Sequence, residues 1–415
     1  MKFNEVTLGE ISVFYNNLRK PVSKLQRKVG TFPYYGAAGI QDYVSDYIFE
    51  GKYILVGEDG TVITKSLTPV IQIAYGKFWV NNHAHVILPR DESDFDYLYY
   101  AIAASNIDNL VTGAVQPKLS MTNLKSLELP WPADRNVRAT IGKLLRSLDE
   151  LIEGNIKLSK TLESIAQTIF KSWFIDFDPV RAKMAGEGPI GMDAETAELF
   201  PDSMEESELG MIPSGWTLSN IRGICDKIIN GSTPLRSNKD FWDGRDLKWF
   251  KTGELADGFL LDSKEHISSL ALERTSVKVL PKGAVLMAIY AAPTVGRLGI
   301  LTSDATFNQA CTGMLAQKKY GLEFLYLNLL FLRKFFNSRA IGAAQQNISK
   351  VVVEEAPVVL GSDQLHLAFS KLISPIFAQI ESLTQQNRTL AEIRDALLPR
   401  LISGELQIPD EMLES

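Results

Sequence analysis

Cysteine and histidine are scarce in this sequence, and it has no long apolar run. Its 415 residues include two cysteines and four histidines. Cys225 and Cys311 lack the spacing of a metal site, so we expect a reduced, cytoplasmic protein. No segment approaches the roughly 18 uncharged apolar residues that a membrane helix needs. The start of the chain carries acids early and is unlike a signal peptide.

Basic residues are not in excess either, and the net charge is −6. The acid is concentrated at residues 184–211, which hold eight acidic residues and no basic one. Without this segment the net charge becomes +2. Nucleic-acid binding requires a local basic groove rather than a basic total. The net charge therefore neither supports nor excludes binding to nucleic acid. The length of the chain allows two or three domains.

The sequence contains an internal repeat. Val6–Ile11 (VTLGEI) returns as Trp216–Ile221 (WTLSNI), and Gly113–Gln116 (GAVQ) returns as Gly342–Gln345 (GAAQ). The offset grows from 210 to 229 between these anchors. The second copy therefore carries insertions.

A long helix is predicted at the end of each copy, because apolar residues recur there on alternating four- and three-residue steps. Each seam contains one Asn at offset 232, and such an Asn fixes register at a cost in stability. We therefore predict an antiparallel coiled coil; the alternative is that each helix only covers its own domain. The predicted seam residues are Leu144, Leu148, Leu151, Asn155, Leu158, Leu162, Ile165 and Ile169, and Ile376, Ile380, Leu383, Asn387, Leu390, Leu397 and Leu401.

Short apolar runs bounded by turn residues predict strands before each helix, for example at Tyr53–Val56, Val70–Ala74 and Ala284–Ile289. The predicted fold class is α+β, with two pseudo-repeated α+β domains separated by two long helices paired as an antiparallel coiled coil. The expected boundaries are 1–133 for the first domain, 134–183 for the first helix, 184–211 for a flexible acidic linker, 212–358 for the second domain, 359–406 for the second helix and 407–415 for a tail.

Motifs of enzymes are weak throughout. Gly186–Gly191 has the form G-x-G-x-x-G, but no predicted strand leads into it and its Glu would repel phosphate. Asp178–Val180 lacks the second Pro and the aromatic residue that grip a flipped base in amino-methyltransferases. His83 and His85 have no third ligand nearby in sequence, and the acids at 91–96 have no Lys in nuclease spacing. We predict neither a catalytic site nor a metal site.

Four stretches resemble the specificity subunit of a Type I restriction–modification system. They are Phe170–Lys183 (FKSWFIDFDPVRAK), Pro213–Trp216 (PSGW), Gly231–Pro234 (GSTP, followed by Asp240-Phe-Trp242 and Trp249) and Gly342–Ser349 (GAAQQNIS). The resemblance extends from residue 1 to about residue 406. It includes the order recognition domain, helix, recognition domain, helix.

This resemblance implies a non-catalytic DNA-binding subunit that acts in phage defence. It would read an asymmetric bipartite double-stranded target, with one half for each recognition domain. It would direct methylation and restriction by two methyltransferase (modification) subunits and by restriction/translocase subunits. The family also implies that S-adenosylmethionine, ATP and Mg bind to those partners, and that this chain binds no cofactor.

Loop residues are the candidate DNA contacts, because Gln, Asn and Arg can pair with base edges while Thr and Lys mostly hold phosphates. Solvated loops are the alternative reading. The candidates are Tyr34, Tyr35, Lys65, Gln116 and Lys118 in the first half, and Ser232, Thr233, Arg236, Lys239, Tyr290, Thr294, Arg297, Gln345, Gln346 and Asn347 in the second.

An aromatic–basic cluster at the end of the first helix is the candidate partner-docking surface, namely Lys171, Trp173, Phe174, Arg181 and Lys183. Burial in the adjoining domain would explain Trp173 and Phe174 equally well. Two other classes of protein compete with this interpretation. A fused methylating enzyme would transfer methyl groups alone, and a coiled-coil adaptor would show no sequence-selective DNA binding with its partners.

Overall fold

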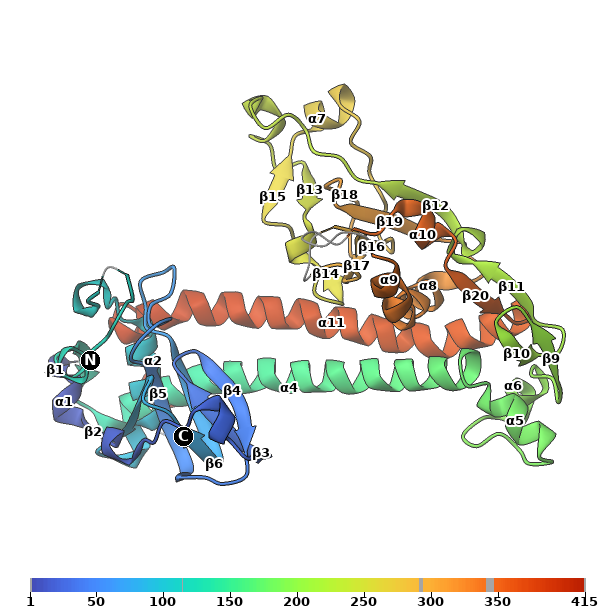
Figure 1. The fold of residues 1–415 in the computed structure, drawn as a ribbon. Coiled ribbons are helices and arrows are strands. Elements are labelled where there is room, and N and C mark those ends of the chain that lie inside the picture. Colours follow the sequence, from blue (N-terminus) through green and yellow to red (C-terminus); the bar gives the residue numbers. More distant parts are fainter. Residues whose placement is uncertain (1, 114, 291–293, 341–346, 414–415) are drawn as a thin grey trace. The chain divides into compact units, whose positions relative to one another are not determined.

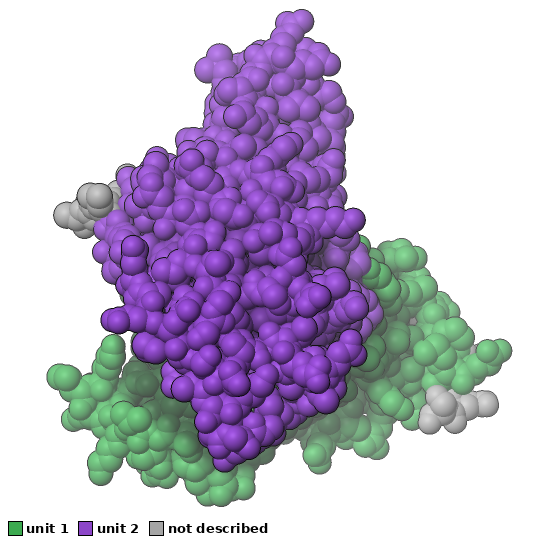
Figure 2. Space-filling view, turned by 90° about the vertical axis from the view of Figure 1, so that its right-hand side faces the viewer, with its two compact units in different colours: residues 1–153, 388–415 green, residues 154–387 purple. Residues whose placement is uncertain are grey.

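The computed structural model describes residues 2–113, 115–290, 294–340 and 347–413. The chain divides into two compact units (Figure 2). The first unit comprises residues 1–153 and 388–415, and the second comprises residues 154–387. Each unit contains one α+β domain and part of two 40-residue helices, α4 (Arg135–Phe174) and α11 (Asp363–Ile402), labelled in Figure 1.

The first domain is built on a six-stranded sheet with the order β2-β7-β5-β6-β3-β4. Neighbouring strands are antiparallel except for β3 and β6, which are parallel. A separate two-stranded sheet pairs β1 with β8. The strands are β1 Phe3–Thr7, β2 Ser12–Phe14, β3 Val29–Gly36, β4 Gly39–Val44, β5 Phe49–Gly57, β6 Ile71–Val80, β7 Ala84–Pro89 and β8 Glu128–Pro132, and the helices are α1 Leu8–Ile11, α2 Phe95–Ala104 and α3 Met121–Lys125.

The core of the first unit lies between this domain and the ends of the two long helices. β5 is buried on both faces at Ile54, Leu55 and Val56, as the continuous apolar run predicts. α2 packs closely against α4, because a Cβ added at Gly142 would approach the backbone nitrogen of Tyr97 to 2.6 Å. Only glycine permits this contact without a shift of the helices.

The second domain has a five-stranded sheet of order β12-β19-β16-β17-β14 and a three-stranded sheet of order β15-β13-β18. Two-stranded sheets pair β9 with β10 and β11 with β20. The strands are β9 Met204–Ser207, β10 Gly210–Pro213, β11 Thr217–Asn220, β12 Cys225–Asn230, β13 Leu247–Phe250, β14 Phe259–Leu260, β15 Glu265–Ile267, β16 Val285–Ala288, β17 Leu298–Leu301, β18 Ala305–Phe307, β19 Cys311–Ala316 and β20 Pro357–Leu360, and the helices are α5 Asp178–Met184, α6 Ala194–Glu198, α7 Ser269–Arg274, α8 Gly321–Phe331, α9 Arg333–Arg339 and α10 Lys350–Glu354.

The two long helices pair antiparallel, as predicted. In the second unit, Asn155 Nδ2 donates a hydrogen bond to Asn387 Oδ1 at 3.0 Å, and the ring of Phe369 near the start of α11 contacts that of Trp173 near the end of α4. In the first unit, Arg394 Nη1 lies 2.6 Å from Asp149 Oδ1. Residues later in α4 therefore contact residues earlier in α11, as in an antiparallel pair.

The buried face of α4 does not coincide with the predicted seam. Leu151, Leu158 and Ile165 are 55%, 45% and 44% exposed, whereas Ala166 and Phe170 of the same helix are fully buried. Ala166 and Phe170 belong to the core that α4 shares with the second domain, where the ring of Phe170 contacts that of Phe324. The coiled coil is confirmed, but these three predicted seam residues are partly exposed.

The acidic segment 184–211 differs from the expected flexible linker. It contains α6 and most of the β9–β10 hairpin, and Phe200 is buried in the core of the second unit beside Trp173. The side chain of Lys183 donates hydrogen bonds to the carbonyl oxygens of Ala197 and Phe200. Apolar residues between the acids anchor the segment to the core of the second unit. The acidic composition alone does not reveal this anchoring.

Candidate nucleic-acid interface

Three segments that are distant in the sequence meet at one edge of the first domain. Glu58, at the end of β5, donates its backbone N–H to the carbonyl oxygen of His83 at 2.8 Å, and Leu119 donates its own to the carbonyl oxygen of Glu58 at 2.8 Å. Asp59 forms an isolated bridge with Lys118. The turn before β7 and the loop before α3 are therefore both attached to the end of β5.

The second domain assembles the same three segments. Ile289 donates its backbone N–H to Ala310 at 2.9 Å, and Ile348 donates its own to Ile289 at 2.9 Å. Tyr290 forms an isolated bridge with Asn347. In the sequence, the repeated Gly-Ala-x-Gln motif precedes Lys118 in the first domain and Asn347 in the second. The repeat is thus a repeat of loop clusters as well as of helices.

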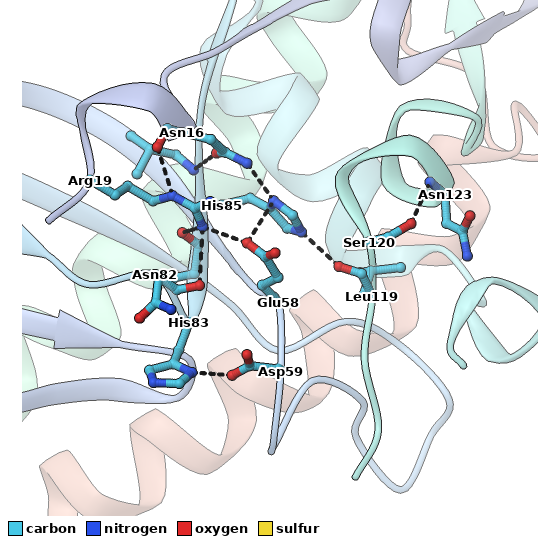
Figure 3. Close-up of polar contacts among 12 residues, drawn as sticks. Asn16, Arg19, Glu58, Asp59, Asn82, His83, His85, Leu119, Ser120 and Asn123 are labelled. Atoms are coloured by element: carbon cyan, nitrogen blue, oxygen red, sulfur yellow. Dashed lines mark hydrogen bonds and ion pairs between the residues drawn. The ribbon is translucent and has the colours of Figure 1, made fainter. Parts of the chain in front are cut away.

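A buried histidine positions one of these loops in the first domain (Figure 3). Asn16 Oδ1 accepts from the backbone N–H of Val86 at 3.1 Å, so its Nδ2 must donate to His85 Nδ1, which lies 2.8 Å away. His85 Nε2 then donates to the carbonyl oxygen of Leu119 at 2.8 Å. Burial lowers the pKa of His85, in agreement with this neutral tautomer. The ring fixes Leu119, the residue that follows the candidate contact Lys118.

Basic groups accompany the acids of this cluster. Arg19 Nη1 lies 2.5 Å from Glu58 Oε2 and also donates to the carbonyl oxygen of Ala84 at 2.7 Å, and His83 pairs with Asp59 (Figure 3). The positive charge of Arg19 reduces the repulsion that a free Glu58 carboxylate would exert on phosphates. Among the described residues, no three His, Cys, Asp or Glu side chains gather as metal ligands would. His83 and His85 bond to different partners.

The structure separates the candidates of the first half. Lys65, Gln116 and Lys118 are exposed on loops. Tyr34 and Tyr35 are only 1% and 8% exposed, so they are core residues in this structure and the prediction of DNA contact is wrong for them. The hydroxyl of Tyr34 accepts from the backbone of Val22, and the ring of Tyr35 packs edge-on against Phe78. They lie on strand β3 and not, as the sequence predicts, on a loop.

An aromatic–ionic site holds Arg236 in the second half. Its guanidinium lies 3.7 Å from the ring centroid of Trp242 and 2.7 Å from Glu265 Oε2. Half of the Arg236 side chain remains exposed. Stacking on an aromatic ring restricts the planar guanidinium and leaves its outer edge free to donate.

The other candidates of the second half differ in exposure. Thr233, Lys239 and Tyr290 are exposed, and Thr233 donates to Gln309 Oε1. The hydroxyl of Ser232 is buried. Gln345 and Gln346 lie outside the described residues. Thr294, Arg297 and Asn347 are half-buried, as is Ser232 as a whole.

The aromatic residues of the predicted docking cluster lie in the core of the second unit. Trp173 and Phe174 are 6% and 3% exposed, so burial, the alternative reading, explains them and docking through their rings is wrong. Lys171 pairs with Asp176, and Arg181 donates to the backbone carbonyl of Asp176 at 2.9 Å. These bases, like Lys183, stabilise the chain as it leaves α4.

Fold and loop clusters together define a protein with two equivalent recognition modules on a paired-helix scaffold. Residues 1–164 and 213–391 match the family model described as Type I restriction modification DNA specificity domain. The chain therefore belongs to this family. It is a DNA target-recognition subunit without a catalytic site of its own, as the sequence predicts.

Specificity subunits of two organisms are similar to the chain. The HindI subunit of Haemophilus influenzae is 29% identical over 332 residues, which cover 70% of this chain and 71% of that protein. The MjaIX subunit of Methanocaldococcus jannaschii is 25% identical over 371 residues, covering 85% and 78%. The solved S subunit from M. genitalium shares the fold with a TM-score of 0.61, 14% identity and coverage of 97% and 96%. Within the described part of the chain, no helix is both long and apolar enough to cross a membrane.

Proposed function

We propose that each recognition domain reads one half of a bipartite double-stranded DNA target and that the chain directs partner subunits to that target. One observation carries this proposal: the same three-segment loop cluster occurs once in each unit. A duplicated interface on one chain is suited to a target with two parts.

The side chains of the two clusters differ at matching positions, which favours an asymmetric target. The first domain has Asp59 and Lys118 where the second has Tyr290 and Asn347. Carboxylates accept hydrogen bonds from cytosine and amides pair with adenine, whereas Lys mostly contacts phosphates. Two clusters with different donors and acceptors would read different half-sites.

The exposed loop residues are the proposed contacts. Gln116 and Arg236 have the groups to read base edges, and the exposed Lys and Thr side chains suit phosphate. Besides these two, the proposed set comprises the exposed Lys65, Lys118, Thr233, Lys239 and Tyr290 and the half-buried Thr294, Arg297 and Asn347.

We also propose that two copies of a methyltransferase subunit bind this chain at equivalent grooves. An open groove of about 400 Å³ lies along the start of α4 in the first unit, and one of about 880 Å³ lies along the start of α11 in the second. Both are lined by the same five helix positions at an offset of 228, namely Asn136, Ala139, Thr140, Lys143 and Leu144, and Gln364, Leu367, Ala368, Lys371 and Leu372. A groove that recurs with the repeat suits one partner surface used twice.

In this proposal the partners bind the cofactors. S-adenosylmethionine would bind to the methyltransferase subunits, and ATP and Mg to restriction/translocase subunits. The described residues of this chain offer no cluster of metal-ligating side chains. Its own side chains would supply orientation, because they fix which DNA sequence meets the partner's active site.

Methylation mapping tests the proposal. The chain is co-expressed with a DNA adenine methyltransferase subunit, and the DNA of the host is sequenced for methylated bases. We expect one bipartite motif with a non-specific spacer, and no methyl transfer by this chain alone. Methylation without sequence preference in the complex would refute the proposal, as would methyl transfer by the pure chain.

A further inference from the structure

The turn that leads into β7 has a fixed backbone and one free amide side chain. Asn81 donates its backbone N–H to the carbonyl oxygen of Tyr35 at 3.1 Å, and its Oδ1 accepts from the backbone N–H of His83 at 2.8 Å. The side chain of Asn81 is thereby used within the turn. The next residue, Asn82, is exposed, and none of the described residues hydrogen-bonds its carboxamide (Figure 3).

The turn that leads into β19 has the same construction. Asn308 donates its backbone N–H to the carbonyl oxygen of Phe250 at 2.9 Å, and its Oδ1 accepts from the backbone N–H of Ala310 at 3.2 Å. The next residue, Gln309, is exposed. Its Oε1 accepts from the hydroxyl of Thr233, which fixes the orientation of the amide and leaves its NH₂ group free to donate.

Both turns belong to the loop clusters described above. The third residue of each turn, His83 or Ala310, accepts a backbone hydrogen bond from the end of the adjacent strand, at Glu58 or Ile289. The exposed amide therefore stands next to the other candidate contacts in its own domain. Its stem is held by a backbone that is bonded on both sides, which reduces the entropy lost when the amide binds.

We propose that Asn82 and Gln309 are specificity-determining residues, each of which reads an adenine in the half-site of its own domain. A carboxamide carries one donor and one acceptor side by side and complements the N6 and N7 edge of adenine. A carboxamide side chain, of Asn82 or Gln309, occupies the same place in both repeats, while the Asn before it is used by the turn. This inference rests on the proposed function, because it needs each domain to read DNA.

Single substitutions in the complex with the methyltransferase subunit test this role. Asn82→Ala should reduce discrimination at one base pair of the first half-site by about tenfold to a hundredfold, and Gln309→Ala should do so in the second half-site only. Asn82→Asp keeps the size of the side chain but only accepts hydrogen bonds. It should therefore shift the preference at the same base pair from adenine toward cytosine.

Gln386→Ala is the matched control, since Gln386 is an exposed amide on α11. It should leave the methylated motif unchanged. Thermal unfolding of each variant should match the wild type, because the substituted side chains are exposed. A uniform loss of binding to all sequences would mark these residues as phosphate contacts and overturn the inference. An unchanged motif in Asn82→Ala and Gln309→Ala would also overturn it. If the wild-type complex itself shows no bipartite motif, the proposed function fails instead.

Discussion

A buried ion pair in the first domain shows how much one residue can contribute. Arg138 Nε lies 2.7 Å from Asp94 Oδ1 and its Nη2 lies 3.1 Å from Oδ2, with both side chains buried. Removing the cation would leave a buried carboxylate without its partner. We expect Arg138→Met to lower the free energy of unfolding by about 3–5 kcal/mol. Chemical denaturation measures it.

A nearby ion pair provides the control for this prediction. Arg135 pairs with Asp91 at 3.0 Å, but both side chains are largely exposed. Water solvates the carboxylate whether or not its partner is present, so Arg135→Met should cost less than about 1 kcal/mol. Equal losses in the two variants would show that burial does not decide the strength of the Arg138 pair.

His366 makes the stability of the second unit depend on pH. It is fully buried among the rings of Phe174, Tyr320 and Phe324, and neither ring nitrogen has a hydrogen-bond partner among the described residues. Burial lowers the pKa of His366 to about 4, despite the opposite effect of Asp363. Because the folded pKa lies below the unfolded value, this contribution to stability is present above about pH 6.5 and is lost as the pH falls toward 4.

Comparison with a variant isolates this effect from carboxylates that titrate in the same range. His366→Phe places an apolar ring among the aromatic side chains and removes the titrating group. Between pH 6.5 and 4 the wild type should lose roughly 3 kcal/mol more than the variant, measured by denaturation at each pH. Parallel stability profiles for the two proteins would contradict the prediction.

At the scale of single residues, the sequence predicted exposure on loops correctly where the neighbouring residues determine it, while contact with DNA stays a prediction. Lys65, Gln116 and Lys118 are exposed on loops as expected. Tyr34 and Trp173 could not be placed from their neighbours in the sequence, because strands and helices from elsewhere cover them. The sequence did not single out Asn82 as a candidate contact. Its exposure depends on the backbone hydrogen bond that Asn81 donates to Tyr35 of β3, which the sequence does not reveal. One pattern could have indicated it: an Asn followed by a second amide residue precedes a strand at Asn81-Asn82 and again at Asn308-Gln309.

Among the elements, the pairing of the long helices was the most predictable feature. Two Asn residues in matching apolar seams predicted a polar pair, and Asn155 and Asn387 form it. Periodicity is a property of a single helix, so it reveals the apolar face. It does not show which flank of that face an adjoining domain covers, and Leu158 and Ile165 remain half exposed for this reason.

The Asn pair should cost stability and specify alignment. Asn155→Leu alone would leave the Asn387 amide without its partner, so we expect a loss of about 1 kcal/mol. Asn155→Leu combined with Asn387→Leu should recover this loss or exceed the wild-type stability, because two apolar seam residues replace a polar pair. Thermal unfolding of the three variants, including Asn387→Leu, forms a double-mutant cycle. Additive losses in the double variant would contradict coupling of the two amides.

At the scale of the whole molecule, the order of domains and helices could be read from the repeat, but the loop clusters could not. The anchors Gly113–Gln116 and Gly342–Gln345 are visible as a repeated sequence. Leu119 and Ile348, which follow these anchors, bond to the chain at the ends of β5 and β16, and these hydrogen bonds join segments tens of residues apart. The two grooves could not be predicted from the sequence either, since only Lys143/Lys371 and Leu144/Leu372 of their equivalent positions carry the same residue.

These grooves give a prediction about the stoichiometry of the assembly. Lys143 and Lys371 are exposed and occupy the same position in the two grooves. Among the equivalent lining positions of the described residues, only this pair has a charged residue in both grooves. A partner that presents one surface to both grooves would place an acidic group near each Lys. Lys143→Glu should therefore weaken the binding of one methyltransferase copy, and Lys371→Glu should weaken the binding of the other.

Native mass spectrometry of the purified complex counts the bound copies. Each single variant should shift the population from two copies to one, and the double variant should shift it toward none. Lys157→Glu is the control, because Lys157 is exposed on α4 outside both grooves. It should retain two copies. The two sites are independent in this proposal because each groove lies within its own unit. Loss of both copies in either single variant would show a shared site instead, and two copies in the double variant would place the partner elsewhere on the chain.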